Sequence, residues 1–294
     1  MLLVDISLQM RKNHAKLDFL KTTTGIPTGL EYGTLRTLEM LEKKFPDDQI
    51  VLCFDSPVNR RKQVSEDYKA NRAPLSDEYK NRYKAFKKFL KCVYCSAEKH
   101  GAEADDVMYT LSRNNHNGIC YIYSNDDDML QAIDDELKVQ VIKSWKSNLY
   151  FWDAAKVFEK YGVYPVFLPI LRAFIGDGSD NLKGVERINK KYLAAVLDWC
   201  RRRRLNLFQI LDEVRTADWS KTERARINEF ITSGKFDDNR SLMQLEYDPG
   251  IVIERPVTNE TYIVESLSLW EIMSLKLSEK YKDQLISVSD NDEF

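Results

Sequence analysis

The sequence predicts an α/β fold with a largely parallel central sheet flanked by helices, followed by a helical C-terminal region. Short apolar runs typical of buried strands alternate with helical patterns in the first half of the chain. From Val166 onward almost every segment has a helical pattern. We therefore expect an α/β domain over 1–164 and a helical region over 165–294.

Four apolar runs predict strands, and the segments between them predict helices. One predicted helix covers 33–45, with four apolar side chains on one face, and another begins near Glu103. Strand–helix alternation of this kind favours parallel strands joined by helical crossovers. The predicted strands are 2–6 (LLVDI), 50–55 (IVLCFD), 119–124 (ICYIYS) and 139–142 (VQVI).

Composition limits the class of protein. The 294 residues are 43% hydrophobic, enough for a sizeable core, and no apolar run approaches the ~20 residues of a membrane span. The first residues lead directly into a predicted strand, so no signal peptide is expected, and five cysteines fit a reducing cytoplasm. Cys92 and Cys95 form an isolated C-x-x-C, which favours reduced cysteines over a zinc site.

Nine carboxylates lie in five short clusters, and three of these clusters end or follow a predicted strand. Such residues commonly cap helices or form turns. Five clusters within the first 180 residues instead predict a shared crevice, where a cation must offset their repulsion. Carboxylates without His or Cys suit Mg²⁺ or Mn²⁺. The residues are Asp5, Asp55, Glu103, Asp105, Asp106, Asp126, Asp128, Asp177 and Asp180.

Periodicity suggests how these carboxylates point. On a helix opening at Glu103, Glu103 and Asp106 share a face, and Asp105 points elsewhere or reaches the ions from the first turn. If strand geometry continues through 126–128, Asp126 and Asp128 lie on one side, which leaves Asp127 as a bystander. Asp177 and Asp180 fit a turn leading into a helix. Two divalent ions ~4 Å apart would support in-line displacement at phosphorus.

A basic segment over 57–100 separates two carboxylate clusters. It holds twelve cations against five carboxylates, with interleaved Tyr and Phe. This pattern fits either a solvated helix face or a surface that neutralises phosphates and stacks bases. Lys69 and Arg72, predicted to lie one helical turn apart, could contact one phosphate. The other candidate nucleic-acid contacts are Arg60, Arg61, Lys62, Arg82, Lys87, Arg187, Lys190 and Lys191.

These motifs together resemble the 5′ nuclease family of flap endonucleases and 5′→3′ exonucleases. The similar pieces are FDS, YKANR, GAEADD, S-x-D-x-D and GDGSDN, in this order over roughly residues 1–190. The compact chain is most similar to the stand-alone bacteriophage members, including phage ribonuclease H. The resemblance implies a PIN-like core, a helical arch over 57–100 and a helix-hairpin-type DNA-binding motif in the C-terminal region.

The resemblance also implies roles for individual residues. The residues that match the family's first metal group are Asp5, Asp55, Glu103, Asp105 and Asp106. The residues that match its second metal group are Asp126, Asp128, Asp177 and Asp180. Lys69, Arg72 and the preceding Tyr68 match the catalytic residues of the arch. The implied activity is Mg²⁺-dependent cleavage of DNA and RNA–DNA hybrids at 5′ ends or flaps, as in RNA primer removal, by a monomer without membrane contact.

One motif departs from the family. Where family members often have GVxGIGxK, this chain has GVERINKKY, so Arg187 and Asn189 replace two glycines. A close backbone approach to a duplex, and the monovalent-ion site that accompanies it, are therefore less expected here. The side chains of Arg187, Lys190 and Lys191 could contact phosphates instead.

Two other functions stay open at this point: a structure-specific nucleic-acid-binding module with weak or no catalysis, and a PIN-like ribonuclease acting on structured RNA. The acidic tail over 287–294 is expected to be disordered, or to dock on a single-strand-binding or other replication protein.

Overall fold

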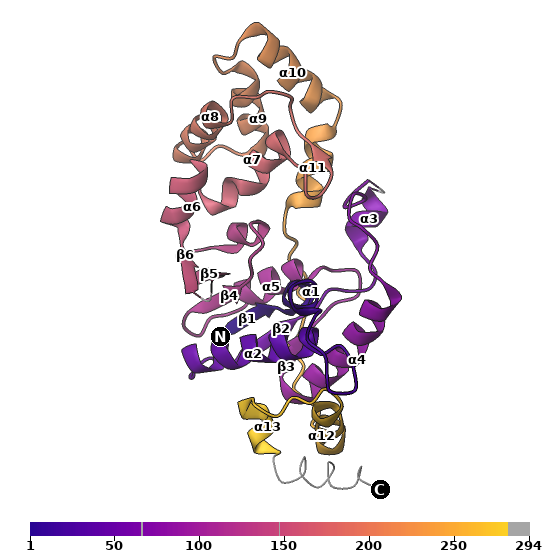
Figure 1. Cartoon of the computed structure of the whole chain (residues 1–294). Coiled ribbons are helices and arrows are strands. Elements are labelled where there is room, and N and C mark those ends of the chain that lie inside the picture. The colour runs from indigo at the N-terminus through magenta and orange to yellow at the C-terminus, as the bar shows by residue number, and fades with distance from the viewer. Residues whose placement is uncertain (66, 147, 282–294) are drawn as a thin grey trace, which may run out of the picture.

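A six-stranded sheet forms the centre of the molecule in this computed structural model, which describes residues 1–65, 67–146 and 148–281 (Figure 1). The strand order is β3-β2-β1-β4-β5-β6; the first five strands are parallel, and β6 is antiparallel to β5. The α/β class and all four predicted strands are confirmed. The strands are β1 Leu2–Asp5, β2 Ile50–Cys53, β3 Cys95–Ala97, β4 Cys120–Tyr123, β5 Val139–Trp145 and β6 Asn148–Trp152.

Both faces of the sheet are buried, as expected for parallel strands. Leu3 of β1 packs into one hydrophobic core, whereas Leu2 and Val4 pack into a second core on the other side. This alternation follows from the two-residue period of a strand. The helices of this domain are α1 Ile6–Leu17, α2 Gly29–Lys44, α5 Ala104–Arg113 and α6 Ala154–Tyr161, with a 3-10 helix η1 at Asp128–Ala132.

The basic segment 57–100 contains two helices and one strand of the sheet. The short helix α3 (Arg60–Val64) stands away from the sheet, above the long helix α4 (Asp77–Val93) (Figure 1). The chain then returns to the sheet as β3, the edge strand that the sequence analysis missed. Lys69 and Arg72 lie in consecutive turns between the two helices. The expectation that one helix holds both residues is therefore wrong.

The C-terminal region begins with helices grouped at one end of the molecule (Figure 1). The GDGSDN motif forms a tight hairpin rather than a turn into a helix. Gly184 is required there, because an added Cβ would lie 2.3 Å from the Phe174 carbonyl oxygen. The elements are η2 Pro165–Phe167, α7 Leu168–Ile175, β7 Gly176–Asp177, β8 Leu182–Lys183, α8 Lys190–Arg202, α9 Leu207–Thr216, α10 Lys221–Thr232 and α11 Lys235–Met243.

The last two described helices leave this group. After α11 the chain runs back along the sheet, and α12 (Glu260–Leu269) and α13 (Lys276–Lys280) lie at the opposite end (Figure 1). Trp270 packs edge-on against Phe86 and Phe89 of α4. Residues 260–281 thus pack on the α/β domain, although they belong to the predicted C-terminal region 165–294. The tail over 287–294 lies outside the described residues. No helix in the described part of the chain is long and apolar enough to span a membrane.

Candidate metal centre and nucleic-acid interface

Four carboxylates gather at the carboxyl edge of the parallel sheet, and we call Asp5, Asp55, Asp105 and Asp126 the edge carboxylates. Asp5 ends β1, while Asp55 and Asp126 follow β2 and β4, so parallel pairing brings these three to one edge. Asp5 accepts hydrogen bonds from the Leu8 backbone N–H (3.0 Å) and the Ser124 hydroxyl (2.9 Å). The Ala104 N–H donates to Asp55 (2.9 Å), which ties the start of α5 to this edge.

The edge carboxylates affect one another's ionisation. Burial, and then the charge of Asp55, raise the pKa of Asp5 to about 7. Burial raises the pKa of Asp105 strongly, and the charges of Asp126 and Asp5 add to that effect. Burial also raises the pKa of Asp126, although nearby cations oppose this shift. Buried charges that repel each other form a site whose electrostatics favour a cation.

Arg61 pairs with the two other carboxylates at the start of α5, Glu103 and Asp106. Its guanidinium donates to both carboxylate oxygens of Asp106 (2.6 and 2.9 Å) and to Glu103 (2.6 Å). Glu103 and Asp106 also form the capping box of α5. Glu103 and Asp106 therefore share a face, as helix periodicity predicted, but Arg61 occupies that face; Asp105 reaches the edge carboxylates from the first turn of α5. With its side chain only 7% exposed, Arg61 holds α3 against α5 rather than facing nucleic acid as predicted.

Lys69 and Arg72 each contact a different carboxylate. Lys69, in a left-handed backbone conformation (φ 57°), places Nζ 2.6 Å from Glu103, while Arg72 pairs with Asp180 at 2.6 Å. The buried Tyr68 hydroxyl donates to Glu103 (3.2 Å), and its ring lies 4.7 Å from Lys69 Nζ. Burial would raise the pKa of Glu103, but Lys69 and Arg61 hold it below its usual value.

A second carboxylate group, Asp128, Asp177 and Asp180, is paired with arginines of the chain. Arg172 of α7 pairs with Asp128 and lies 3.4 Å from Asp177. Burial opposes ionisation of Asp177, but hydrogen bonds from Ser179 and the charge of Arg172 lower its pKa. The sequence analysis missed Arg172. Its signal was the single cation within the apolar run VFLPILRAFIG.

The strand period that set Asp127 apart from its neighbours does not apply in this segment. Strand β4 ends at Tyr123, and Asp128 begins a 3-10 helix, so no strand period links the acids after β4. Asp127 pairs instead with Lys143 and Lys160 and accepts a hydrogen bond from the Tyr161 hydroxyl (2.6 Å). These contacts outweigh burial and lower the pKa of Asp127.

The donor chemistry of both groups suits a hard divalent cation, since every side chain offers carboxylate oxygens. Within residues 1–65, 67–146 and 148–281, however, no three Asp, Glu, His or Cys side chains are already close enough together to hold a metal ion. Arg172 and Arg72 contact the second group directly, so an ion binding there would have to compete with them.

The remaining predicted nucleic-acid contacts fall into two sets. Arg60, Arg82 and Lys87 pair with Glu246, Glu31 and Glu98, respectively. Lys62, Arg187, Lys190 and Lys191 are exposed.

The loop before α8 holds a non-glycine residue in a conformation that favours glycine. Arg187 adopts a left-handed conformation (φ 53°) that glycine adopts more readily. Asn189 caps α8 by accepting the Tyr192 N–H (3.1 Å), which leaves Lys190 and Lys191 in the first turn. The exposed cations thus lie beside a helix N-terminus, where anions are favoured.

Comparison with known protein families shows which family the chain belongs to. The model of the 5′-3′ exonuclease N-terminal resolvase-like domain matches residues 1–162. The chain belongs to this 5′-3′ exonuclease family. A "5'-3' exonuclease" of Aquifex aeolicus is 34% identical over 182 residues, which are 60% of this chain and 62% of that protein. A DNA polymerase I of Caldicellulosiruptor bescii is 31% identical over 220 residues, 72% of this chain but 26% of that protein.

Solved structures of similar shape support the fold of this 5′-3′ exonuclease family member. The T5 D15 protein co-crystallized with metal ions matches with a TM-score of 0.60 at 19% identity, covering 98% of each chain. The catalytic core of Rad2 in complex with DNA substrate matches with a TM-score of 0.55 at 14% identity, covering 97% of this chain and 90% of that one. At these identities the likeness establishes a shared PIN-like fold.

Proposed function

We propose that this chain is a metal-dependent nuclease that hydrolyses phosphodiester bonds at 5′ ends or flaps of DNA and of RNA–DNA hybrids, as RNA primer removal requires. The observation that carries the proposal is the group of edge carboxylates, with Asp5 buried and the other three half-buried, beside the turns that hold Lys69 and Arg72. Membership of the 5′-3′ exonuclease family supports it, as do the names of the relatives.

Two Mg²⁺ ions, with Mn²⁺ as a substitute, are the cofactors that we propose. When bound, such ions activate a water and stabilise the leaving oxygen of a phosphodiester. The edge carboxylates would hold one ion. Asp128, Asp177 and Asp180 would hold the other after Arg172 and Arg72 release them. Asp106 would remain with Arg61, and Glu103 would be free to bind an ion only when Lys69 moves.

The cations of the arch would bind the phosphate that is cleaved. Lys69 and Arg72 can exchange their carboxylate partners for phosphate oxygens, because both partnerships are charge-assisted hydrogen bonds. Tyr68 would position Lys69, since its ring lies under the ammonium group. The exposed Lys62, Arg187, Lys190 and Lys191 would contact phosphates farther along the substrate, which makes binding salt-dependent.

The decisive experiment uses Asp126→Asn with a 5′-labelled flap, a nicked duplex and an RNA–DNA hybrid. We expect the variant to lose Mg²⁺-dependent cleavage while it binds the flap nearly as well as wild type. Asp134→Asn is the matched control, because Asp134 pairs with Arg113 away from the edge carboxylates. Undiminished cleavage by Asp126→Asn would refute the assignment.

The labelled flap, compared with an added RNA hairpin, separates the two alternative functions. Tight flap binding by the wild type without cleavage across a Mg²⁺ titration would favour a binding module. Preferential cleavage of RNA hairpins over DNA flaps would favour a structured-RNA nuclease. The mutually repelling edge carboxylates argue against the binding module, because they carry an electrostatic cost that a binding surface does not need.

A further inference from the structure

The β5–β6 hairpin carries an exposed aromatic face beside the proposed metal centre. Lys143 pairs across the hairpin with Tyr150, and Val141 pairs with Trp152. Because side chains alternate along a strand, Lys143, Tyr150 and Trp152 therefore point to the same side. Tyr150 is 48% exposed, and Trp145, at the end of β5, is 66% exposed. Large exposed rings on an edge strand are costly unless something covers them.

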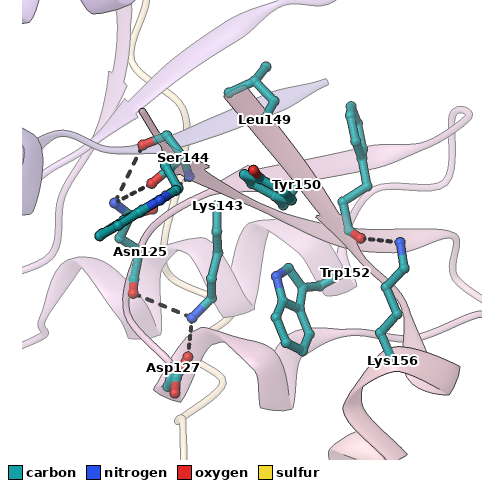
Figure 2. A pocket seen from close by; sticks show the side chains of 10 residues that line it. Asn125, Asp127, Lys143, Ser144, Leu149, Tyr150, Trp152 and Lys156 are labelled. Atoms are coloured by element: carbon teal, nitrogen blue, oxygen red, sulfur yellow. Dashed lines mark hydrogen bonds and ion pairs between the residues drawn. The ribbon is translucent and has the colours of Figure 1, made fainter. Parts of the chain in front are cut away.

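These side chains line a groove that has room for a nucleotide. The hairpin, the loop after β4 and the start of α6 enclose a hollow of about 740 Å³. Figure 2 shows Tyr150 and Trp152 on one side of it and Lys143 directed toward Asn125 and Asp127. A volume of this size lies within the range of small-ligand sites. We call this hollow the hairpin groove.

The hairpin groove lies beside the candidate metal centre, because Asn125 and Asp127, which line it, flank Asp126 in the sequence. Trp145 ends a strand that runs parallel to β4, so it reaches the same edge of the sheet as Asp126. The Lys143 ammonium donates to the Asn125 carbonyl (3.3 Å) and pairs with Asp127, the residues on either side of Asp126. A strand whose phosphate lies at the edge carboxylates would therefore have a neighbouring nucleotide close to the groove.

The charges around the groove favour a nucleic acid over an apolar partner. Lys143 and Lys156 line it together with one carboxylate, Asp127, and Lys160 lies beside it in an ion pair with Asp127. Lys160 Nζ lies 5.2 Å from the Trp152 ring centre, which places a cation beside an aromatic face. Aromatic faces with adjacent cations can stack a base and bind its phosphate together.

We propose that the hairpin groove holds one unpaired base of the substrate strand, stacked on Tyr150 and Trp145, with its phosphate on Lys156 and Lys160. The inference rests on the proposed nuclease function for the identity of the strand. It adds a base-binding subsite that contacts neither the edge carboxylates nor Lys69 and Arg72. Because every base has an aromatic face, the subsite would accept DNA and RNA alike.

The test uses flap oligonucleotides with the fluorescent base 2-aminopurine at successive positions within three nucleotides of the cleaved bond. Ca²⁺ replaces Mg²⁺ so that binding is measured without cleavage. We expect the wild type to change the fluorescence strongly at one position. Tyr150→Ala and Trp145→Ala should abolish that change and weaken binding about 5- to 150-fold, as stacking of one base contributes about 1–3 kcal/mol.

Phe208→Ala is the matched control, because Phe208 is an exposed ring (85%) on α9, away from the hairpin. It should leave the fluorescence change intact, and cleavage of the flap by the wild type in Mg²⁺ tests the nuclease function separately. Equal fluorescence and affinity for wild type, Tyr150→Ala and Trp145→Ala, with each variant folded by circular dichroism, would overturn the subsite. Cleavage by the wild type would still stand in that case.

Discussion

The edge carboxylates and the second carboxylate group differ in what surrounds their charges. The pKa values of Asp5 and Asp105 are raised by burial and by neighbouring carboxylates. Asp128, Asp177 and Asp180 instead have arginine partners, and the pKa of Asp177 is lowered. One group is therefore destabilised until a cation binds, whereas the other is neutralised by the chain itself. We infer that the two metal sites would differ in affinity, with the edge carboxylates binding first.

Replacing one edge carboxylate should have the largest effect. Asp105→Asn should reduce cleavage at least ~10³-fold, because it removes a proposed metal ligand. In EDTA the same variant should be more stable than wild type by roughly 1 kcal/mol, since it removes repulsion among buried charges. Thermal unfolding in EDTA should therefore show a midpoint about 2–4 °C higher. A variant that is less stable than wild type in EDTA would contradict the claim that the edge carboxylates repel one another when no metal is bound.

Lys69 should affect the chemical step more than binding. Lys69→Ala should slow single-turnover cleavage about 10²- to 10³-fold while flap affinity falls only severalfold, because phosphate positioning counts most in the transition state. Lys62→Ala is the control: this exposed neighbour should lower affinity at low salt and leave the cleavage rate of the bound substrate unchanged. Equal losses of rate and affinity in Lys69→Ala would indicate a binding role alone.

Arg172→Gln should sharpen the contrast between the two groups. Without the Arg172 charge, Asp128 and Asp177 lose a competitor for cations, so Ca²⁺ should bind the second group roughly tenfold more tightly. Calorimetric titration with Ca²⁺ measures this directly and does not depend on activity. Arg113→Gln, which removes an arginine–aspartate pair elsewhere, should leave both affinities unchanged. Weaker Ca²⁺ binding by Arg172→Gln would show that Arg172 supports the site instead of competing for it.

The smallest effect concerns pH in the absence of metal. The pKa of Asp5 is about 7 in the folded chain, above its usual value of 3.8, so the folded state holds a proton that the unfolded state releases. The stability due to this group is fully present below pH ~4 and is lost as pH rises through ~7. In EDTA, Asp5→Asn should remove at least ~1 kcal/mol of this decline between pH 5 and pH 8. Identical pH profiles of urea unfolding for both proteins would contradict it.

Sequence patterns predicted the part of the site that depends on the sheet. Asp5, Asp55 and Asp126 follow parallel strands, and strand topology alone places such residues together. Helix periodicity correctly placed Glu103 and Asp106 on one face, but it could not predict that Arg61, distant in sequence, occupies that face.

Periodicity also could not predict the long-range ion pairs, because their partners are far apart in the sequence. No spacing rule links Arg172 to Asp128 or Arg72 to Asp180; tertiary packing brings them together. The positive φ of Lys69 likewise had no local signal in YKANR. The strands β3 and β6 were missed because both are short edge strands with partly exposed residues.

Counting bound Mn²⁺ by electron paramagnetic resonance during a titration tests the central comparison most directly. Free Mn²⁺ gives a sharp signal, so its loss reports each ion bound to the protein. We predict two sites whose dissociation constants differ at least tenfold, with the tighter one lost in Asp105→Asn and retained in Asp177→Asn. Two sites of equal affinity, or a tighter site that survives in Asp105→Asn, would contradict the account.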